Sequence, residues 1–169
     1  MKKDNGFSVL ELIVVVTVIG ILATFAVDRL WAVQIDAENT AMENVVGSLR
    51  SALGMKVAQY IAKSDINGLK SLEGGNPMEE LVEPPKNYVG AITNPDPASV
   101  AGGNWYFDAN AKALVYRVHN ADSFSSKLGM PARARFGVQL VYQAQDKNVN
   151  PHVVGVRLVA LEPYRWVNE

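Results

Sequence analysis

One carboxylate stands out because it lies inside a long apolar segment. The run from Phe7 to Val27 contains a single charged residue, Glu11, and two lysines, Lys2 and Lys3, precede it. As a helix, these 21 residues extend about 30 Å, which is the thickness of the hydrocarbon core of a bilayer. A carboxylate near one end of such a helix is costly in lipid. We therefore expect Glu11 to be functional and to have a partner.

The other groups that could support chemistry are weaker candidates. His119 and His152 are the only histidines and the chain has no cysteine, so a zinc site of the usual ligand spacing cannot be assembled. We expect both histidines at the surface, at strand ends. Asp96, Asp108 and Asp122 fall in or beside predicted loops, where they could hold calcium, although solvated carboxylates are the favoured interpretation. No motif of a catalytic nucleophile is present. The sequence therefore predicts no enzyme, no metal and no cofactor.

Composition limits the classes of function. The net charge of −1 argues against a nucleic-acid partner, because no basic field is present. The 169 residues suffice for one membrane helix and one domain of roughly a hundred residues. Without cysteines, packing alone must stabilise that domain.

The helical pattern continues beyond the apolar run. No proline occurs between Phe7 and Lys63, and one apolar stripe has helical spacing: Met42, Val46, Leu49, Leu53, Val57 and Tyr60. The sequence predicts one long helix. Residues 7–27 would span the membrane, and residues 28–63 would form an amphipathic continuation packed on a head of residues 64–169.

The head has mainly strand patterns. Asn76-Pro77-Met78-Glu79 predicts the start of a short helix, and the turn-rich segment from Tyr88 to Asn104 is expected to be an exposed loop. The predicted strands are 105–108 and 113–118, joined as a hairpin, then 136–143 and 153–161, joined by a polar turn. Trp105, Tyr106 and Phe107 are expected to pack in the core. The fold class is α+β, with the long helix on an antiparallel sheet of about four strands.

The N-terminus resembles a known family. Gly6-Phe7 followed by Glu11 and the apolar run is similar to the leader of type IV pilins and type II secretion pseudopilins. The resemblance implies a pilin-like fold with a leader at residues 1–6, cleavage between Gly6 and Phe7 by a prepilin peptidase, and N-methylation of Phe7. It also implies that Glu11, the fifth mature residue, pairs with the N-terminal amine of a neighbouring subunit.

The function implied is that of a structural filament subunit, expected to be a minor pilin of a type IV pilus. Its partners would be other pilin subunits, the prepilin peptidase and the assembly machinery of the bacterial inner membrane. The chain would cross that membrane once with its N-terminus in the cytoplasm, and would later enter a periplasmic or extracellular filament. The segments DAENTAMENVVGSLRSALGMKVAQYIA and NWYFD are most similar to pilins of the mannose-sensitive haemagglutinin type.

Two features depart from the family pattern. Many pilins close a C-terminal loop with a disulfide, and many have a proline where Asp28 stands here. Three alternatives stay open: a type II secretion pseudopilin, a secretory signal peptide, and an uncleaved single-span anchor for a binding domain that forms no filament. Retention of the leader in the mature protein would indicate the uncleaved single-span anchor.

Overall fold

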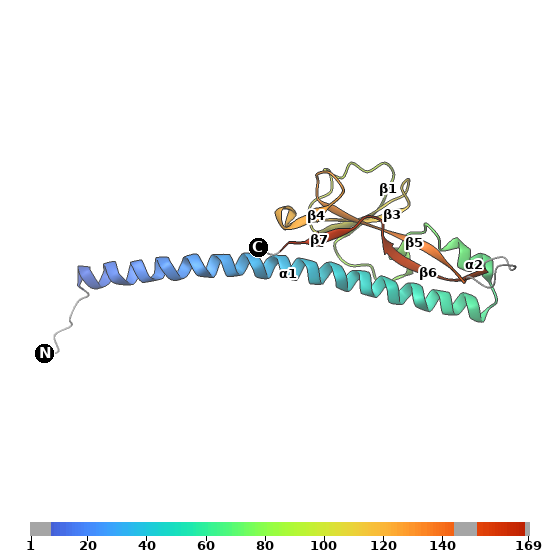
Figure 1. Ribbon diagram of the computed structural model, residues 1–169, viewed down its shortest axis with the longest axis horizontal. Coiled ribbons are helices and arrows are strands. Elements are labelled where there is room, and N and C mark those ends of the chain that lie inside the picture. The colour runs from blue at the N-terminus through green and yellow to red at the C-terminus, as the bar shows by residue number, and fades with distance from the viewer. Residues whose placement is uncertain (1–7, 144–151, 168–169) are drawn as a thin grey trace. The chain divides into compact units, whose positions relative to one another are not determined.

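The computed structural model describes residues 8–143 and 152–167, and it forms two compact units, Met1–Ala37 and Glu38–Glu169. The helix α1 (Val9–Ala62) runs through both units, and the head carries the remaining elements (Figure 1). In chain order these are α2 (Ile66–Ser71), η1 (Pro77–Glu80), β1 (Tyr88–Ile92), β2 (Asn104–Asp108), β3 (Ala113–Arg117), η2 (Ala121–Ser123), β4 (Phe124–Ser126), β5 (Arg133–Gln143), β6 (His152–Ala160) and β7 (Tyr164–Trp166).

The predicted long helix is confirmed as a single α1 of 54 residues. Its uninterrupted course follows from the absence of proline, which would remove a backbone donor and clash with the preceding turn. It ends beside Ser64, whose backbone has a positive φ of 54°. The Asp65 side chain then caps α2 by accepting a hydrogen bond from the backbone N–H of Gly68. We did not predict α2, because Asn67 and Gly68 are poor helix formers.

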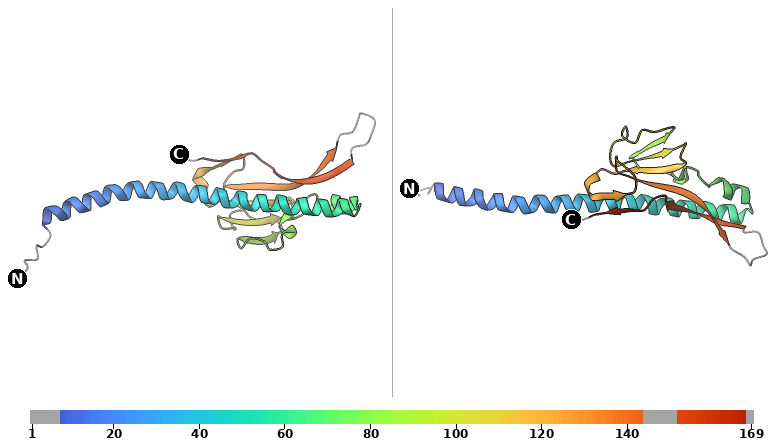
Figure 2. Two further views of the ribbon diagram at one scale, coloured as in Figure 1. Left: turned by 90° about the horizontal axis from the view of Figure 1, so that it is seen from below. Right: turned by 45° about the horizontal axis from the view of Figure 1, so that its top comes forward.

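The main sheet has five strands in the order β1-β2-β3-β5-β6. The predicted hairpin is confirmed as β2 and β3, with Trp105 opposite Tyr116, and the predicted pair at the C-terminal end is confirmed as β5 and β6. Figure 2 shows β5 and β6 as a long twisted pair. The polar turn predicted between them lies outside the described residues.

One prediction about the sheet was wrong. The segment from Tyr88 to Asn104 was expected to be a loop, but it begins with β1, which pairs with β2 in parallel. Parallel neighbours need a long connection, and the proline- and glycine-rich residues 93–103 supply it. Gly90, with a φ of +117°, interrupts the regular pairing of β1. This irregularity and the short length of β1 hid the strand from a pattern of period two.

A second, two-stranded sheet was also missed. β4 and β7 pair antiparallel, with Phe124 opposite Trp166. Each strand has only three residues, which is too short for a recognisable alternation. The strands are also far apart in sequence, so only the tertiary fold brings them together.

The core lies between the head's part of α1 and the inner face of the main sheet. The predicted apolar stripe is confirmed: Met42, Val46, Leu49 and Leu53 are buried, and Val57 and Tyr60 pack at the margin of the same cluster. The sheet contributes the following buried side chains: Trp105, Phe107, Leu114, Tyr116, Ala134, Phe136 and Val138. The core therefore has two layers, as a helix on a sheet requires.

The outer face of the main sheet carries a smaller apolar cluster. Tyr106 and Val115 are buried there beneath Val100, with Ile92 alongside. Trp105, Tyr106 and Phe107 thus all pack as predicted, on alternate faces of β2. The predicted helix start at Asn76 is also confirmed, because its side chain accepts a hydrogen bond from the N–H of Met78 at the beginning of η1.

Candidate functional site

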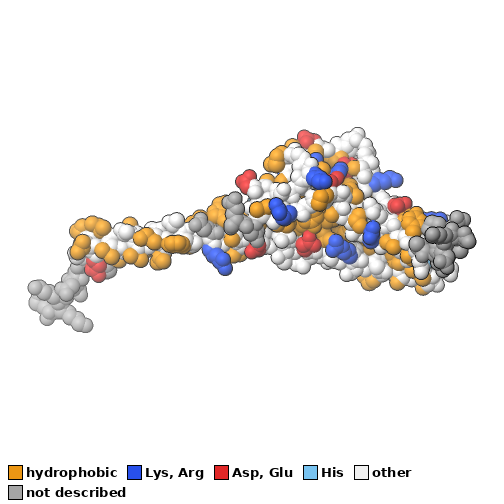
Figure 3. Space-filling view, viewed as in Figure 1, with side chains coloured by type: hydrophobic (Ala, Val, Ile, Leu, Met, Phe, Trp, Pro, Cys, Tyr) orange, Lys and Arg blue, Asp and Glu red, His pale blue; other side chains and the backbone are white. Residues whose placement is uncertain are grey.

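The N-terminal part of α1 presents apolar side chains in every direction. The large hydrophobic residues between Val9 and Val27 are 41–74% exposed. The helix α1 is long and apolar enough to cross a membrane, with a mean hydropathy of 2.6 over its most apolar 18 residues. Figure 3 shows these side chains along the helix. A helix that is hydrophobic all round belongs in lipid or against other apolar helices.

The few hydroxyl groups in this apolar segment are satisfied within the helix. The Thr17 hydroxyl donates to the carbonyl oxygen of Ile13 at 2.8 Å, and that of Thr24 donates to the carbonyl of Gly20 at 3.0 Å. Such local bonds remove the need for water around these groups. Both threonines are therefore compatible with an apolar environment.

Glu11 is different because its carboxylate accepts no hydrogen bond from any residue that the structure describes. It lies in the first turn of α1, where the unpaired backbone N–H groups favour a negative charge. Glu11 is therefore a candidate partner for a cation. Gly6 and Phe7, the predicted cleavage and methylation residues, lie outside the described residues.

Comparison with known families matches this same segment. Residues 1–27 match the family model described as "Prokaryotic N-terminal methylation motif". The N-terminus is that of a type IV pilin- or pseudopilin-like prepilin. The motif and the apolar helix indicate a membrane-anchored protein, and the motif indicates a structural subunit of the pilin or pseudopilin kind rather than an enzyme. No curated protein and no solved structure matches the chain, so the similarity to mannose-sensitive haemagglutinin pilins stays a prediction.

In the head of the prepilin, a second glutamate was not singled out from the sequence. One oxygen of Glu38 accepts hydrogen bonds from the Tyr116 hydroxyl at 3.0 Å and from the backbone N–H of His119 at 2.6 Å. The other accepts from the backbone N–H and the side-chain amide of Asn120, at 2.9 and 2.7 Å. Four donors on one carboxylate fix α1 to the end of β3. Only the tertiary fold brings these groups together, so no sequence signal identified them.

A third glutamate on α1 contacts the C-terminal strand. The Tyr164 hydroxyl donates to Glu43 at 2.8 Å, and the Tyr164 ring stacks on Phe124 at a centroid distance of 5.7 Å. Phe124 also meets Trp166 edge-on at 5.1 Å. This C-terminal aromatic cluster of Phe124, Tyr164 and Trp166 joins β4 and β7 in a chain that has no cysteine for a disulfide.

Both tyrosines that bond to α1 are held in the neutral form. Burial raises the pKa of the Tyr116 phenol, and the charge of Glu38 and the hydrogen bond to it raise the pKa further. Burial likewise raises the pKa of Tyr164, with added contributions from the hydrogen bond to Glu43 and from its charge. In each pair the phenol must keep its proton in order to donate a hydrogen bond to the carboxylate.

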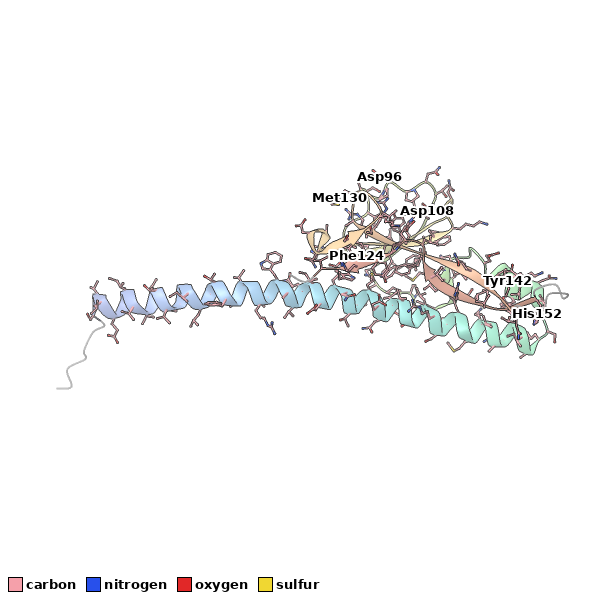
Figure 4. All side chains as sticks on the ribbon, viewed as in Figure 1. Asp96, Asp108, Phe124, Met130, Tyr142 and His152 are labelled. Carbon is pink, nitrogen blue, oxygen red and sulfur yellow. The ribbon has the colours of Figure 1, made fainter. Side chains whose placement is uncertain are left out.

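The histidines and loop aspartates lie where the sequence suggested. His119 and His152 are exposed, His119 after β3 and His152 at the start of β6. Asp96 lies on the loop after β1, where it accepts from the N–H of Ala98, and Asp108 accepts from two N–H groups of the turn after β2 (Figure 4). In the described part of the chain, no three His, Cys, Asp or Glu side chains form a group suited to a metal ion.

Proposed function

We propose that this prepilin is a structural subunit of a type IV pilus-type filament. The proposal rests on the combination, in one segment, of the methylation motif, an apolar helix with exposed side chains and Glu11 in its first turn. A surface of this kind needs either lipid or other helices around it. A subunit that moves from the membrane into a helical bundle satisfies that need at both stages.

Processing would prepare the N-terminus for assembly. Cleavage between Gly6 and Phe7 removes Lys2 and Lys3 and exposes an amine, which becomes methylated on Phe7. Before assembly, the two lysines would keep the N-terminus in the cytoplasm and leave the head on the outer side of the membrane. Cleavage thus removes the two lysines and leaves one cationic amine at the mature N-terminus.

Assembly would then pair Glu11 with the amine of a neighbouring subunit. Leaving the bilayer costs little apolar free energy when lipid contacts are replaced by contacts with similar helices. A lone Glu11 carboxylate in that apolar bundle would be unfavourable, and removing one partner of a buried ion pair costs about 3–5 kcal/mol. The pair would therefore set the relative axial position of neighbouring helices.

A type II secretion pseudopilus is the second filament that this segment supports, because pilins and pseudopilins are processed in the same way. The two differ in where the fibre ends. Fibres that carry the chain outside the cell indicate a pilus, and fibres confined to the periplasm indicate a pseudopilus. Counting the subunits in purified fibres measures whether the chain is a major or a minor component.

The test is Glu11→Ala in the full-length chain. We expect incorporation into sheared fibres to fall by about tenfold or more, while the amount in the membrane and the protease resistance of the head stay normal. Thr17→Val is the matched control, because it removes a polar group that bonds only within its own helix. Mass spectrometry should find methylated Phe7 as the mature N-terminus. Normal incorporation of Glu11→Ala, or a retained leader, would contradict the proposal.

A further inference from the structure

Two arginines on β5 lie on the same face of the sheet but have different partners. Ala134 and Phe136 point into the core, so Arg133 and Arg135 lie on the outer face, away from α1. Arg135 forms a bidentate ion pair: its Nε donates to one oxygen of Glu162 at 3.1 Å, and its Nη2 donates to the other. Arg135 therefore shows how a guanidinium on this surface holds a carboxylate.

Arg133 could hold a carboxylate in the same way, but no carboxylate of the described residues is bound to it. Its Nη1 donates to the carbonyl oxygens of Gly129 and Pro131 at 2.8 and 2.9 Å, which fixes the guanidinium in place. Its Nε and Nη2 atoms, the edge that Arg135 uses for Glu162, donate no hydrogen bond to any residue that the structure describes. A preorganised, unused edge of this kind matches the two oxygens of a carboxylate.

The neighbouring strand adds a second positive charge. Arg117 lies directly opposite Arg133 in the register of β3 and β5. It too is fixed by backbone carbonyls, with Nε donating to Pro97 and Nη1 donating to Val118 and Ala132. Like charges directly opposite each other destabilise a sheet. Neither arginine forms an ion pair within the described residues, so this arginine pair favours an anion from outside the chain.

The geometry favours a carboxylate on a protein over a nucleic acid. Nucleic-acid surfaces neutralise several phosphates with many lysines and arginines. Here two arginines on the outer face have no ion pair within the described residues, and the chain has a net charge of −1. One bidentate carboxylate neutralises half of this local charge and uses the free edge of Arg133.

We propose that Arg133 binds Glu83 of a second copy of the chain. Glu83 is exposed and makes no hydrogen bond or ion pair within the described residues. Beside it, Val82 is fully exposed, and the groove next to both is lined by apolar residues that include Val45, Leu81 and Pro85. Exposed apolar surface next to an unpaired charge is typical of a contact surface.

The two surfaces belong to different parts of the head. The groove at Glu83 is bounded by Asn44, Val45 and Ser48 of α1, and α1 covers the inner face of the sheet. Arg133 lies on the outer face. A contact between two different surfaces repeats from copy to copy in one direction, as an open filament requires. This inference rests on the proposed function, because it places the contact between neighbouring filament subunits.

The test exchanges the two charges in the full-length chain. We expect Arg133→Glu alone and Glu83→Arg alone each to lower incorporation into fibres by about tenfold, and the double variant to recover most of it. Arg133→Lys should lose incorporation in part, because an ammonium cannot form the bidentate pair. The matched controls are Lys127→Glu and Glu73→Arg, exposed charges outside the contact, and both should assemble normally.

The outcomes separate this inference from the proposed function. If the unmodified chain forms no fibres, the proposed function is wrong, and the proposed contact is then wrong as well. If the unmodified chain forms fibres and Arg133→Glu alone incorporates normally, only the contact is wrong. The same holds if adding Glu83→Arg to Arg133→Glu does not restore incorporation. Binding of purified full-length chain to duplex DNA that Arg133→Glu abolishes would assign the arginine pair to nucleic acid, and would also overturn the contact.

Discussion

The carboxylate of Glu38 accepts a hydrogen bond from the Tyr116 hydroxyl at 3.0 Å, although 78 positions separate the two residues in the chain. Glu38 is the first residue of the head unit, and Tyr116 is buried in the main core. Because the same carboxylate also binds the backbone of His119 and Asn120, one side chain joins α1 to the end of β3.

The first prediction concerns this junction. Glu38→Ala should lower the free energy of unfolding of the head by about 1–3 kcal/mol, because it leaves the buried Tyr116 hydroxyl and two backbone N–H groups without their acceptor. Urea unfolding of the full-length chain in detergent, followed by tryptophan fluorescence to which buried Trp105 contributes, measures the change. Glu73→Ala removes an exposed carboxylate and is the control. Equal stability of the two variants would show that water replaces the carboxylate without loss.

The second prediction concerns the C-terminal aromatic cluster. Phe124→Ala should destabilise the head by about 3–5 kcal/mol, because Phe124 is buried and contacts both Tyr164 and Trp166. Tyr164→Phe should cost only about 1 kcal/mol, since it keeps the ring and loses the hydrogen bond to Glu43. Hydrogen exchange of the β7 amides measures both effects. If Phe124→Ala leaves β7 protected, the cluster does not hold the C-terminal strand.

The third prediction is a loss of stability in alkali. The pKa values of Tyr116 and Tyr164 are raised in the folded head above the ordinary value of 10.0. The stability that these two phenols contribute is therefore complete below about pH 10. It is lost as the pH rises above this value, because the unfolded chain releases the phenol protons first. The free energy of unfolding should therefore fall progressively as the pH rises above about 10. Tyr116→Phe should reduce the slope, and an unchanged slope in both Tyr→Phe variants would contradict the assignment.

Much of the fold followed from local patterns. The absence of proline and the stripe from Met42 to Tyr60 predicted α1 and its buried face, because helix periodicity is a local property. The hairpin of β2 and β3 was equally local. The parallel strand β1 and the pair of β4 and β7 were missed, because their partners are distant and their own patterns are too short.

The candidate site divides in the same way. Glu11 could be identified from sequence, since a single charge in an apolar run is visible without a structure. The four-donor environment of Glu38 could not, because two of the donors are backbone N–H groups, and these carry no residue signature. Arg133 and Arg135 look alike in sequence, and only the fold shows that Glu162 pairs with Arg135 and leaves Arg133 open.

The sequence by itself determined that the chain has a prepilin N-terminus, a long helix and an α+β head. Hydrophobic periodicity and the processing motif depend on residues close together in the chain, so no fold is needed to recognise them. Only the tertiary structure decided which charges are already paired and which remain available, because hydrogen-bond partners such as Glu38 and Tyr116 come together only when distant segments pack.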